Sequence, residues 1–224
     1  MCGRFNLITD AGALVDFFEL GQGMEVQPRY NIAPSQDILV VRKTAGERTL
    51  SMLRWGLIPS WAKDPKIGYR MINARAETVA EKPSFRVALR RRRCLIPATG
   101  FYEWKAVPGG KQPYNIQLDD GRLFAFAGLW ERWQGDAGQG VESCTIIVTG
   151  ANRAISPIHD RMPVILDPSD YQSWLDPQLQ DTALLQPLLR PCPSNWINSY
   201  PVSRLVSNPK NDGPECVAPE VIIR

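Results

Sequence analysis

The sequence predicts an α+β fold, a single domain built on a mainly antiparallel, barrel-like β-sheet with a few short helices. Apolar stretches of strand length recur along the 224 residues, and 17 glycines and 19 prolines interrupt them too often for long helices. Hydrophobic residues make up 44% of the chain, which is enough for a sizeable core. Neither a repeat nor a linker divides it, so we expect residues 1–224 to form one domain.

Three segments predict short helices. Asp10 to Leu20 begins with a residue type that caps helix N-termini and turns apolar side chains to one face. Lys82 to Arg92 carries a proline near its first helical position, where the missing N–H is tolerated. A third helix is expected to begin at Asp167-Pro168.

The strands are predicted from alternation and from buried apolar runs. Leu50 to Ile58 and Tyr114 to Leu118 alternate, while Leu123 to Leu129 and Cys144 to Val148 are apolar enough to be buried strands. Asp120-Gly121 is typical of a tight turn, so we expect the strands on either side of it to form a hairpin.

Composition excludes several function classes. The five cysteines are scattered without a CxxC pair and the chain has one histidine, so we expect no structural metal site and no cofactor. No apolar run approaches the roughly 20 residues of a membrane span, and no signal peptide follows Met1. We therefore expect a cytoplasmic monomer that does not bind membranes.

Charge alone does not identify a partner. The net charge is only +3, but Arg90 to Arg93 form a basic block, with Arg86 one turn upstream. Such a block is either a solvated helix end or part of a surface for a polyanion.

Cys2 is the most informative single residue. It follows Met1, and aminopeptidases remove an initiator Met when the next side chain is small. The α-amine and thiol then lie on adjacent carbons, with reference pKa values of about 7.7–8.0 and 8.5. Such a 1,2-aminothiol condenses with an aldehyde to an imine, and the thiol closes a thiazolidine ring.

Four further segments place polar residues among aromatic residues and turn formers, as loops that frame functional sites do. They are Arg29-Tyr30-Asn31-Ile32-Ala33-Pro34, Trp55 to Trp61 continued by Ile72 to Thr78, Pro97 to Lys105, and Pro157 to Pro163. With Cys2-Gly3-Arg4 before them and Pro201-Val202-Ser203 and Asn208 after them, they resemble the SRAP family of abasic-site processing proteins. The resemblance covers nearly the whole chain.

The resemblance implies a protein that covalently captures abasic sites in single-stranded DNA. Family members form a thiazolidine crosslink through the N-terminal cysteine, which shields the lesion, and they also reverse it in some settings. Carried over by motif, Cys2 is the nucleophile, Asn73 positions its amine, and Glu103 and His159 handle protons. The intermediate imine also allows lyase chemistry.

The residue types fit those roles. Opening of the sugar, dehydration of the carbinolamine and closure of the ring each need an acid or a base. Glu103 lies between Tyr102 and Trp104, where desolvation is expected to raise its pKa; the alternative is a surface or salt-bridged glutamate. His159 has the unperturbed pKa suited to proton transfer, although a lone histidine is more often structural.

DNA binding also needs phosphate contacts and stacking surfaces. Arg4 and Arg75 flank the proposed site in sequence, and Arg161 either joins them or pairs with Asp160. Trp61, with Pro59 beside it, either stacks against bases next to the lesion or belongs to the core.

The chain departs from some bacterial relatives at two positions. It has Ala62 where they have a second tryptophan and Pro83 near the position of an arginine. Lys82, Arg86 or the block Arg90 to Arg93 either replaces the lost contact or faces away from the site.

Two rival functions fit parts of the pattern. Cys2, His159 and Asn73 also suit a cysteine peptidase or self-processing hydrolase, as nucleophile, base and orienting residue. The second rival is a non-catalytic module that binds single-stranded DNA. Such a module would not require Glu103 and His159.

Overall fold

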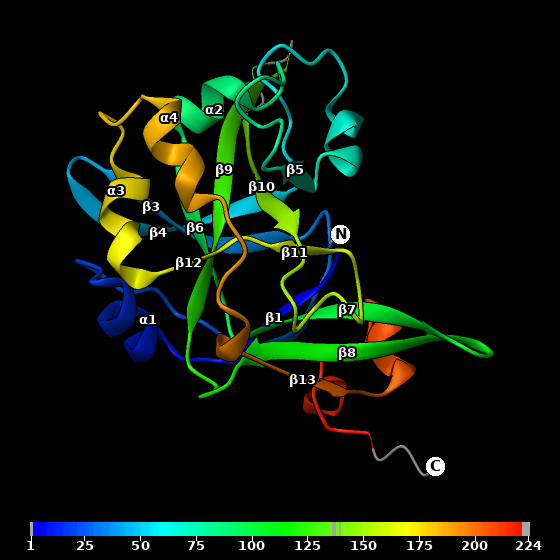
Figure 1. The fold of residues 1–224 in the computed structure, drawn as a ribbon. Coiled ribbons are helices and arrows are strands. Elements are labelled where there is room, and N and C mark those ends of the chain that lie inside the picture. The colour runs from blue at the N-terminus through cyan, green and yellow to red at the C-terminus, as the bar shows by residue number, and fades with distance from the viewer. Residues whose placement is uncertain (1, 136–137, 139, 221–224) are drawn as a thin grey trace.

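Two β-sheets share one hydrophobic core in the part of the chain that the computed structural model describes, residues 2–220 except 136, 137 and 139 (Figure 1). One sheet has the order β13-β8-β7-β1-β2 and is antiparallel. Its strands are β1 (Phe5–Leu7), β2 (Arg29–Ile32), β7 (Gly100–Val107), β8 (Gly110–Leu118) and β13 (Ile197–Pro201).

The other sheet closes into a barrel. Its strands are β3 (Asp37–Thr44), β4 (Glu47–Trp55), β6 (Arg93–Ala98), β9 (Phe124–Gln134) and β10 (Gly140–Gly150). Antiparallel pairing runs from β4 through β3, β6 and β9 to β10, and a parallel pairing of β10 with β4 completes the circle. Closure leaves fewer unpaired strand edges.

Three short strands extend the barrel: β5 (Asn73–Arg75), β11 (Arg161–Pro163) and β12 (Ile165–Leu166). β5 pairs parallel with β10 and β11 pairs antiparallel with it, and both pairings include Val148. Val148 therefore brings Arg75 and Pro163, which are far apart in sequence, to the two sides of one strand.

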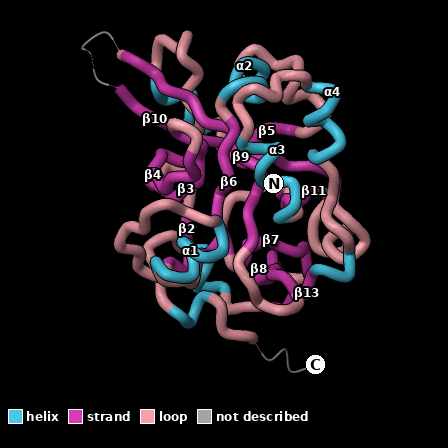
Figure 2. Tube along the Cα trace, turned by 90° about the vertical axis from the view of Figure 1, so that its left-hand side faces the viewer, coloured by secondary structure: helices cyan, strands magenta, loops and turns pink. Residues whose placement is uncertain are grey.

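Short helices lie around these sheets (Figure 2). The α-helices are α1 (Ala11–Phe18), α2 (Arg86–Arg91), α3 (Tyr171–Leu175) and α4 (Thr182–Leu185). The 3-10 helices are η1 (Pro65–Arg70), η2 (Pro168–Asp170), η3 (Gln186–Leu188), η4 (Ser194–Trp196), η5 (Arg204–Ser207) and η6 (Pro214–Cys216). None of the helices in the described residues is long and apolar enough to span a membrane.

The predicted fold class is confirmed, and so are most of its elements. α1 lies within Asp10 to Leu20, and the Asp10 carboxylate accepts the N–H of Ala13 at 2.9 Å as its N-cap. Asp167 caps η2, which leads directly into α3. α2 begins only at Arg86, because residues 82–85 form a turn in which the Phe85 N–H donates to the Lys82 carbonyl.

The predicted hairpin at Asp120-Gly121 is wrong. Gly121 does occupy a turn with φ +67, but the strands on either side of it belong to different sheets. β8 pairs with β7 and β13, so both its edges are taken, while the apolar β9 pairs with β6, β10 and β12. The turn therefore passes the chain from the open sheet into the barrel.

The predicted strand Leu50 to Ile58 ends earlier, at Trp55. Gly56 has φ +132, and a Cβ there would lie 2.7 Å from the Gly68 carbonyl oxygen. The chain leaves the sheet at this glycine and packs its backbone against η1, which places the connection from β4 to β5 beside the barrel.

Candidate functional site

The N-terminal segment is fixed between two strands. β1 pairs with β2 and β7, and the Tyr102 N–H donates to the Arg4 carbonyl at 2.9 Å. The Phe5 ring makes edge contacts with Trp55 at 5.3 Å and Phe126 at 5.8 Å between centroids. In both views this segment lies between β5 and β7 (Figures 1 and 2).

Cys2 lies beneath the surface, with 0% exposure, and its Sγ is 4.0 Å from the Arg4 carbonyl oxygen. Burial raises the pKa of the Cys2 thiol well above its ordinary value, and the charge of nearby Glu103 raises it further. The thiol is therefore protonated at neutral pH and needs a base to become a nucleophile.

Glu103 is placed to be that base. It follows Tyr102 on β7 and is only 3% exposed. Burial raises the pKa of Glu103 to about 7, in the direction that its aromatic neighbours predicted. Near neutral pH both forms of the carboxyl group are populated, so it can accept and return a proton.

His159 faces Glu103 from the loop before β11. Its Nδ1 accepts the Arg161 N–H at 3.0 Å, which puts the proton of the neutral imidazole on Nε2. Nε2 lies 3.9 Å from Glu103 Oε2. Burial lowers the pKa of His159, and when the ring is protonated Nδ1–H can donate to Asp160 Oδ1, 2.9 Å away.

Asn73 begins β5 and is half-buried. Its Nδ2 donates to the Ile72 carbonyl at 3.0 Å, while its buried Oδ1 accepts no hydrogen bond from the described residues. The structure does not give Asn73 and His159 the mutual contact of a peptidase triad within these residues, since His159 Nδ1 faces Arg161 and Asp160 instead.

The three arginines differ in how far they are available. Arg75 is exposed on β5. Arg161 forms a two-pronged ion pair with Glu77, at 2.7 and 2.8 Å, rather than pairing with Asp160. Arg4 Nη1 donates to Asn31 Oδ1 and to the Val206 carbonyl, each at 2.9 Å, so this side chain already joins β1 to β2 and η5.

Asn31 is the supporting residue that the sequence did not single out. Fully buried, it donates through Nδ2 to the carbonyls of Val206, Asn208 and Asn211 at 3.1, 3.0 and 2.6 Å. Asp212 accepts the N–H of Asn31 at 2.7 Å. The only signal was its place in the segment Arg29 to Pro34, which carries no residue of obvious reactivity.

Trp61 and Pro59 occupy one turn but different environments. Trp61 is 57% exposed, so its side chain is not part of the core, whereas Pro59 is buried beneath the turn. The Ala62 N–H donates to the Pro59 carbonyl at 2.9 Å, and Trp133 Nε1 donates to the Ala62 carbonyl at 2.6 Å. The turn thus presents an indole ring to solvent.

The basic block divides. Arg92 pairs with Glu131 at 2.6 Å, and buried Arg93 donates to backbone carbonyls of α2 and of residues 174 and 176. Arg86, Arg90 and Arg91 are exposed along α2, as is Lys82 before it. These four cations remain available to a polyanion.

The model of the family described as SOS response associated peptidase (SRAP) matches residues 1–209. The chain belongs to the SRAP family. It is 49% identical to abasic site processing protein YoqW of Bacillus subtilis over 97% of this chain and 99% of that protein. It is 36% identical to abasic site processing protein HMCES of Gallus gallus, over 86% of this chain and 66% of that protein.

The fold of this SRAP protein also matches solved structures. A crystal structure of a protein from Bacteroides thetaiotaomicron superposes with a TM-score of 0.87 at 27% identity, over 98% of this chain and all of the other. A phage-related protein from Bordetella bronchiseptica superposes with a TM-score of 0.73 at 30% identity, covering 91% of this chain and 95% of the other.

Proposed function

We propose that this protein processes abasic sites by capturing them covalently in single-stranded DNA, through a thiazolidine formed by the amine and thiol of Cys2. Its similarity to proteins named for abasic site processing supports the substrate. The group formed by buried Cys2, buried Glu103 and half-buried His159 supports the chemistry.

The proposed reaction begins when the abasic sugar opens to an aldehyde at C1′. The Cys2 α-amine adds to that carbon and the carbinolamine loses water, which leaves an imine. The thiol then gives its proton to Glu103, its sulfur bonds to C1′, and the nitrogen takes up a proton as the ring closes. Glu103 Oε2 lies 3.9 Å from His159 Nε2, longer than a hydrogen bond, so the two groups exchange protons in each direction of the reaction after closing together or through one water.

The observation that carries the proposal is the placement of Glu103, which is buried, acts by its charge on the Cys2 thiol and has its Oε2 3.9 Å from His159 Nε2. Burial raises the pKa of Glu103 to about 7. Burying a carboxyl group until it is 3% exposed costs folding stability. Buried ionisable groups of this kind are concentrated at functional sites. At that pKa Glu103 can remove a proton from Cys2 and also protonate the leaving oxygen.

The DNA strand is proposed to reach the site along exposed Arg75 and Trp61, with Arg161 and Arg4 nearer the buried group. Arg75 supplies charge for a phosphate, Arg161 contacts one by exchanging Glu77 for it, and Trp61 supplies a face for an unpaired base.

The direct test is a denaturing gel of the purified protein with a single-stranded oligonucleotide that contains one abasic site. The wild-type protein should give a heat-stable band. Cys2→Ser should lose that band but still form an imine that borohydride traps, because the amine remains. Cys192→Ala, at a buried cysteine outside the site, should crosslink like wild type.

Other outcomes have clear meanings. If Cys2→Ser keeps a heat-stable crosslink without reductant, the thiazolidine is wrong. If Cys2→Ala has wild-type affinity and wild type forms no adduct, the protein is a binding module.

The free amine has its own test. An acylated nitrogen has its lone pair delocalised into the peptide bond, so a chain that retains a residue before Cys2 should bind abasic DNA without crosslinking. Intact mass spectrometry should show that the active protein lacks one methionine. Equal crosslinking by the blocked chain would mean that another nucleophile acts.

A further inference from the structure

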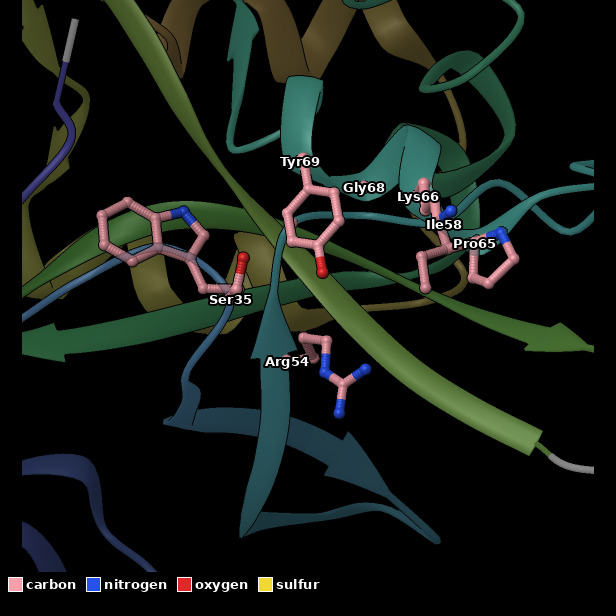
Figure 3. Close-up of a pocket in the computed structure, with 9 residues that line it drawn as sticks. Ser35, Arg54, Ile58, Pro65, Lys66, Gly68 and Tyr69 are labelled. Carbon is pink, nitrogen blue, oxygen red and sulfur yellow. The ribbon is translucent and has the colours of Figure 1, made fainter.

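A surface cavity is lined in part by Trp55, whose ring also contacts the N-terminal segment at Phe5. Its volume is about 300 Å³, at the lower end of the range for small-molecule sites. Residues that line it come from β4 and the connection after it, from η1 and from the loop after β2: Ser35, Arg54, Ile58, Pro65, Lys66 and Tyr69 (Figure 3). The capture chemistry uses none of them.

Trp55 connects this cavity to the candidate site. Its ring contacts Phe5, three residues after Cys2, with centroids 5.3 Å apart. Its Nε1 donates to the Ile72 carbonyl at 2.9 Å, and the same carbonyl accepts a hydrogen bond from Asn73. Trp55 therefore belongs both to the wall of the cavity and to the packing of the segment that carries Cys2, so the two sites are neighbours through one side chain.

Close backbone packing holds the walls together. A Cβ on Gly68 would lie 2.7 Å from the Gly56 carbonyl oxygen, so two glycines let η1 approach the end of β4. Ser35 has φ +70, an unfavourable value for a residue with a side chain, and its N–H donates to the Trp55 carbonyl at 2.8 Å. Backbone held in this way often marks a binding site.

The cavity presents one aromatic ring and two cations. Tyr69 is 68% exposed and points from η1 toward Arg54, with Ser35 on one side and Lys66 on the other (Figure 3). The Arg54 side chain is half exposed, and its Nε is 3.9 Å from Asp37, which is a weak ion pair. Lys66 is exposed. A ring with cations beside it suits a base and its phosphate.

We propose that this cavity binds the nucleotide next to the abasic site on the same DNA strand. Tyr69 stacks on its base, and Arg54 and Lys66 contact its phosphate. This inference rests on the proposed function, because it assigns a neighbour to the captured lesion. It also gives this chain a stacking ring beyond Trp61, where Ala62 follows in place of an aromatic residue.

The test measures fluorescence anisotropy with oligonucleotides that carry an unreactive abasic analogue, placed internally, at the 5′ end or at the 3′ end. Tyr69→Ala should weaken binding of the internal lesion by about 5- to 150-fold, the usual loss for one stacked base. When the lesion is at one of the two ends, the oligonucleotide lacks the neighbouring nucleotide that the cavity is proposed to bind. Tyr69→Ala should bind that oligonucleotide as tightly as wild type does. Tyr69→Phe keeps the stacking face and should bind like wild type.

The cations have a matched control. Arg54→Gln and Lys66→Gln should each lower the log–log salt slope by about 0.7, the value for one phosphate contact on a single strand. Arg122 is equally exposed, at 51%, and likewise faces an aspartate, but it lies in the connection between β8 and β9. Arg122→Gln should leave the slope unchanged.

The inference is overturned if Tyr69→Ala binds all three oligonucleotides like wild type, or loses affinity for all three equally. Its failure is distinguishable from failure of the proposed function, which appears when wild type cannot crosslink a true abasic site. The analogue forms no crosslink, so the cavity test does not depend on that reaction.

Discussion

At the scale of single residues, Glu103 decides how the site responds to pH. Burial keeps the thiol of Cys2 protonated near neutral pH, so the proposed capture requires the ionised form of this carboxyl group. A base with a pKa of about 7 is half ionised at about pH 7.

Glu103→Gln should slow capture by roughly 10²–10⁴-fold, because glutamine can neither accept nor donate the proton. The wild-type rate should rise with pH through about 7, and the variant should lose that inflection. Single-turnover crosslinking across the pH range measures both effects. Glu25→Gln, at an exposed loop position, is the control; a wild-type rate for Glu103→Gln would end its assigned role.

The same residue should make stability depend on pH. The unfolded chain releases this proton near pH 4.5, while the folded protein holds it until about pH 7. Between these values the folded state binds more protons, so raising the pH favours unfolding, by roughly 2–4 kcal/mol in total. Urea unfolding should show wild type losing this stability as pH rises through the window, and Glu103→Gln should not lose it.

His159 should matter more for release than for capture. Reversal of the thiazolidine returns a proton to the sulfur, and the neutral imidazole carries its proton on Nε2, toward Glu103. His159→Ala should slow release from a preformed adduct more than it slows adduct formation. A chase with excess competitor DNA measures release, and an equal effect on both directions would contradict this role.

At the scale of elements, the site depends on β1 being held between β7 and β2, and on side-chain bonds from this pair of strands to the C-terminal segment. Asn31 and Arg4 connect β1 and β2 to the backbone of η5 and the residues after it. β1 begins three residues after Cys2 and is only three residues long, so its few ladder hydrogen bonds give the N-terminal segment little support of their own.

Asn31→Ala should therefore lower stability and capture together. It removes the donor to the Asn208 and Asn211 carbonyls and the acceptor for Arg4, while the Val206 carbonyl keeps Arg4 as a donor; the cost is about 2–4 kcal/mol by the usual net value of each lost bond. Chemical denaturation gives the stability, and crosslinking at low temperature gives the rate of the folded protein. Asn198→Ala, at an exposed position on β13, should change stability by less than about 0.5 kcal/mol.

At the scale of the whole molecule, attraction to DNA cannot come from net charge. The chain carries only +3, and many of its cations are paired with carboxylates, so DNA affinity has to come from local groups such as Arg75. This arrangement suits recognition of a lesion more than indiscriminate coating of DNA.

Affinity for unreactive abasic DNA should fall as salt concentration rises. Each phosphate contact should add about 0.7 to the steepness of the plot of log affinity against log salt concentration. Arg75→Gln should lower this slope by about 0.7, the value of one contact, because the Arg75 side chain is exposed on the strand that also carries Asn73. Arg122→Gln should leave the slope unchanged. A slope near zero for wild type would refute nucleic-acid binding itself.

The sequence by itself determined the features whose causes are local. The cap of α1 at Asp10, the turn at Gly121 and the proline that opens η2 follow from interactions within a few residues. The reactive pair on Cys2 is likewise a property of one residue. The position of Glu103 among aromatic residues was enough to predict the direction of its pKa.

The tertiary structure decided which strands meet. Nothing near Asp120-Gly121 shows that β8 and β9 belong to different sheets, or that parallel pairing of β10 with β4 closes a barrel. Strand partners are chosen by burial and by pairing between distant segments, to which local propensity contributes little. For the same reason the ties of Asn31 to the C-terminal segment, the pairing of Arg161 with Glu77 and the approach of His159 to Glu103 exist only once the chain has folded.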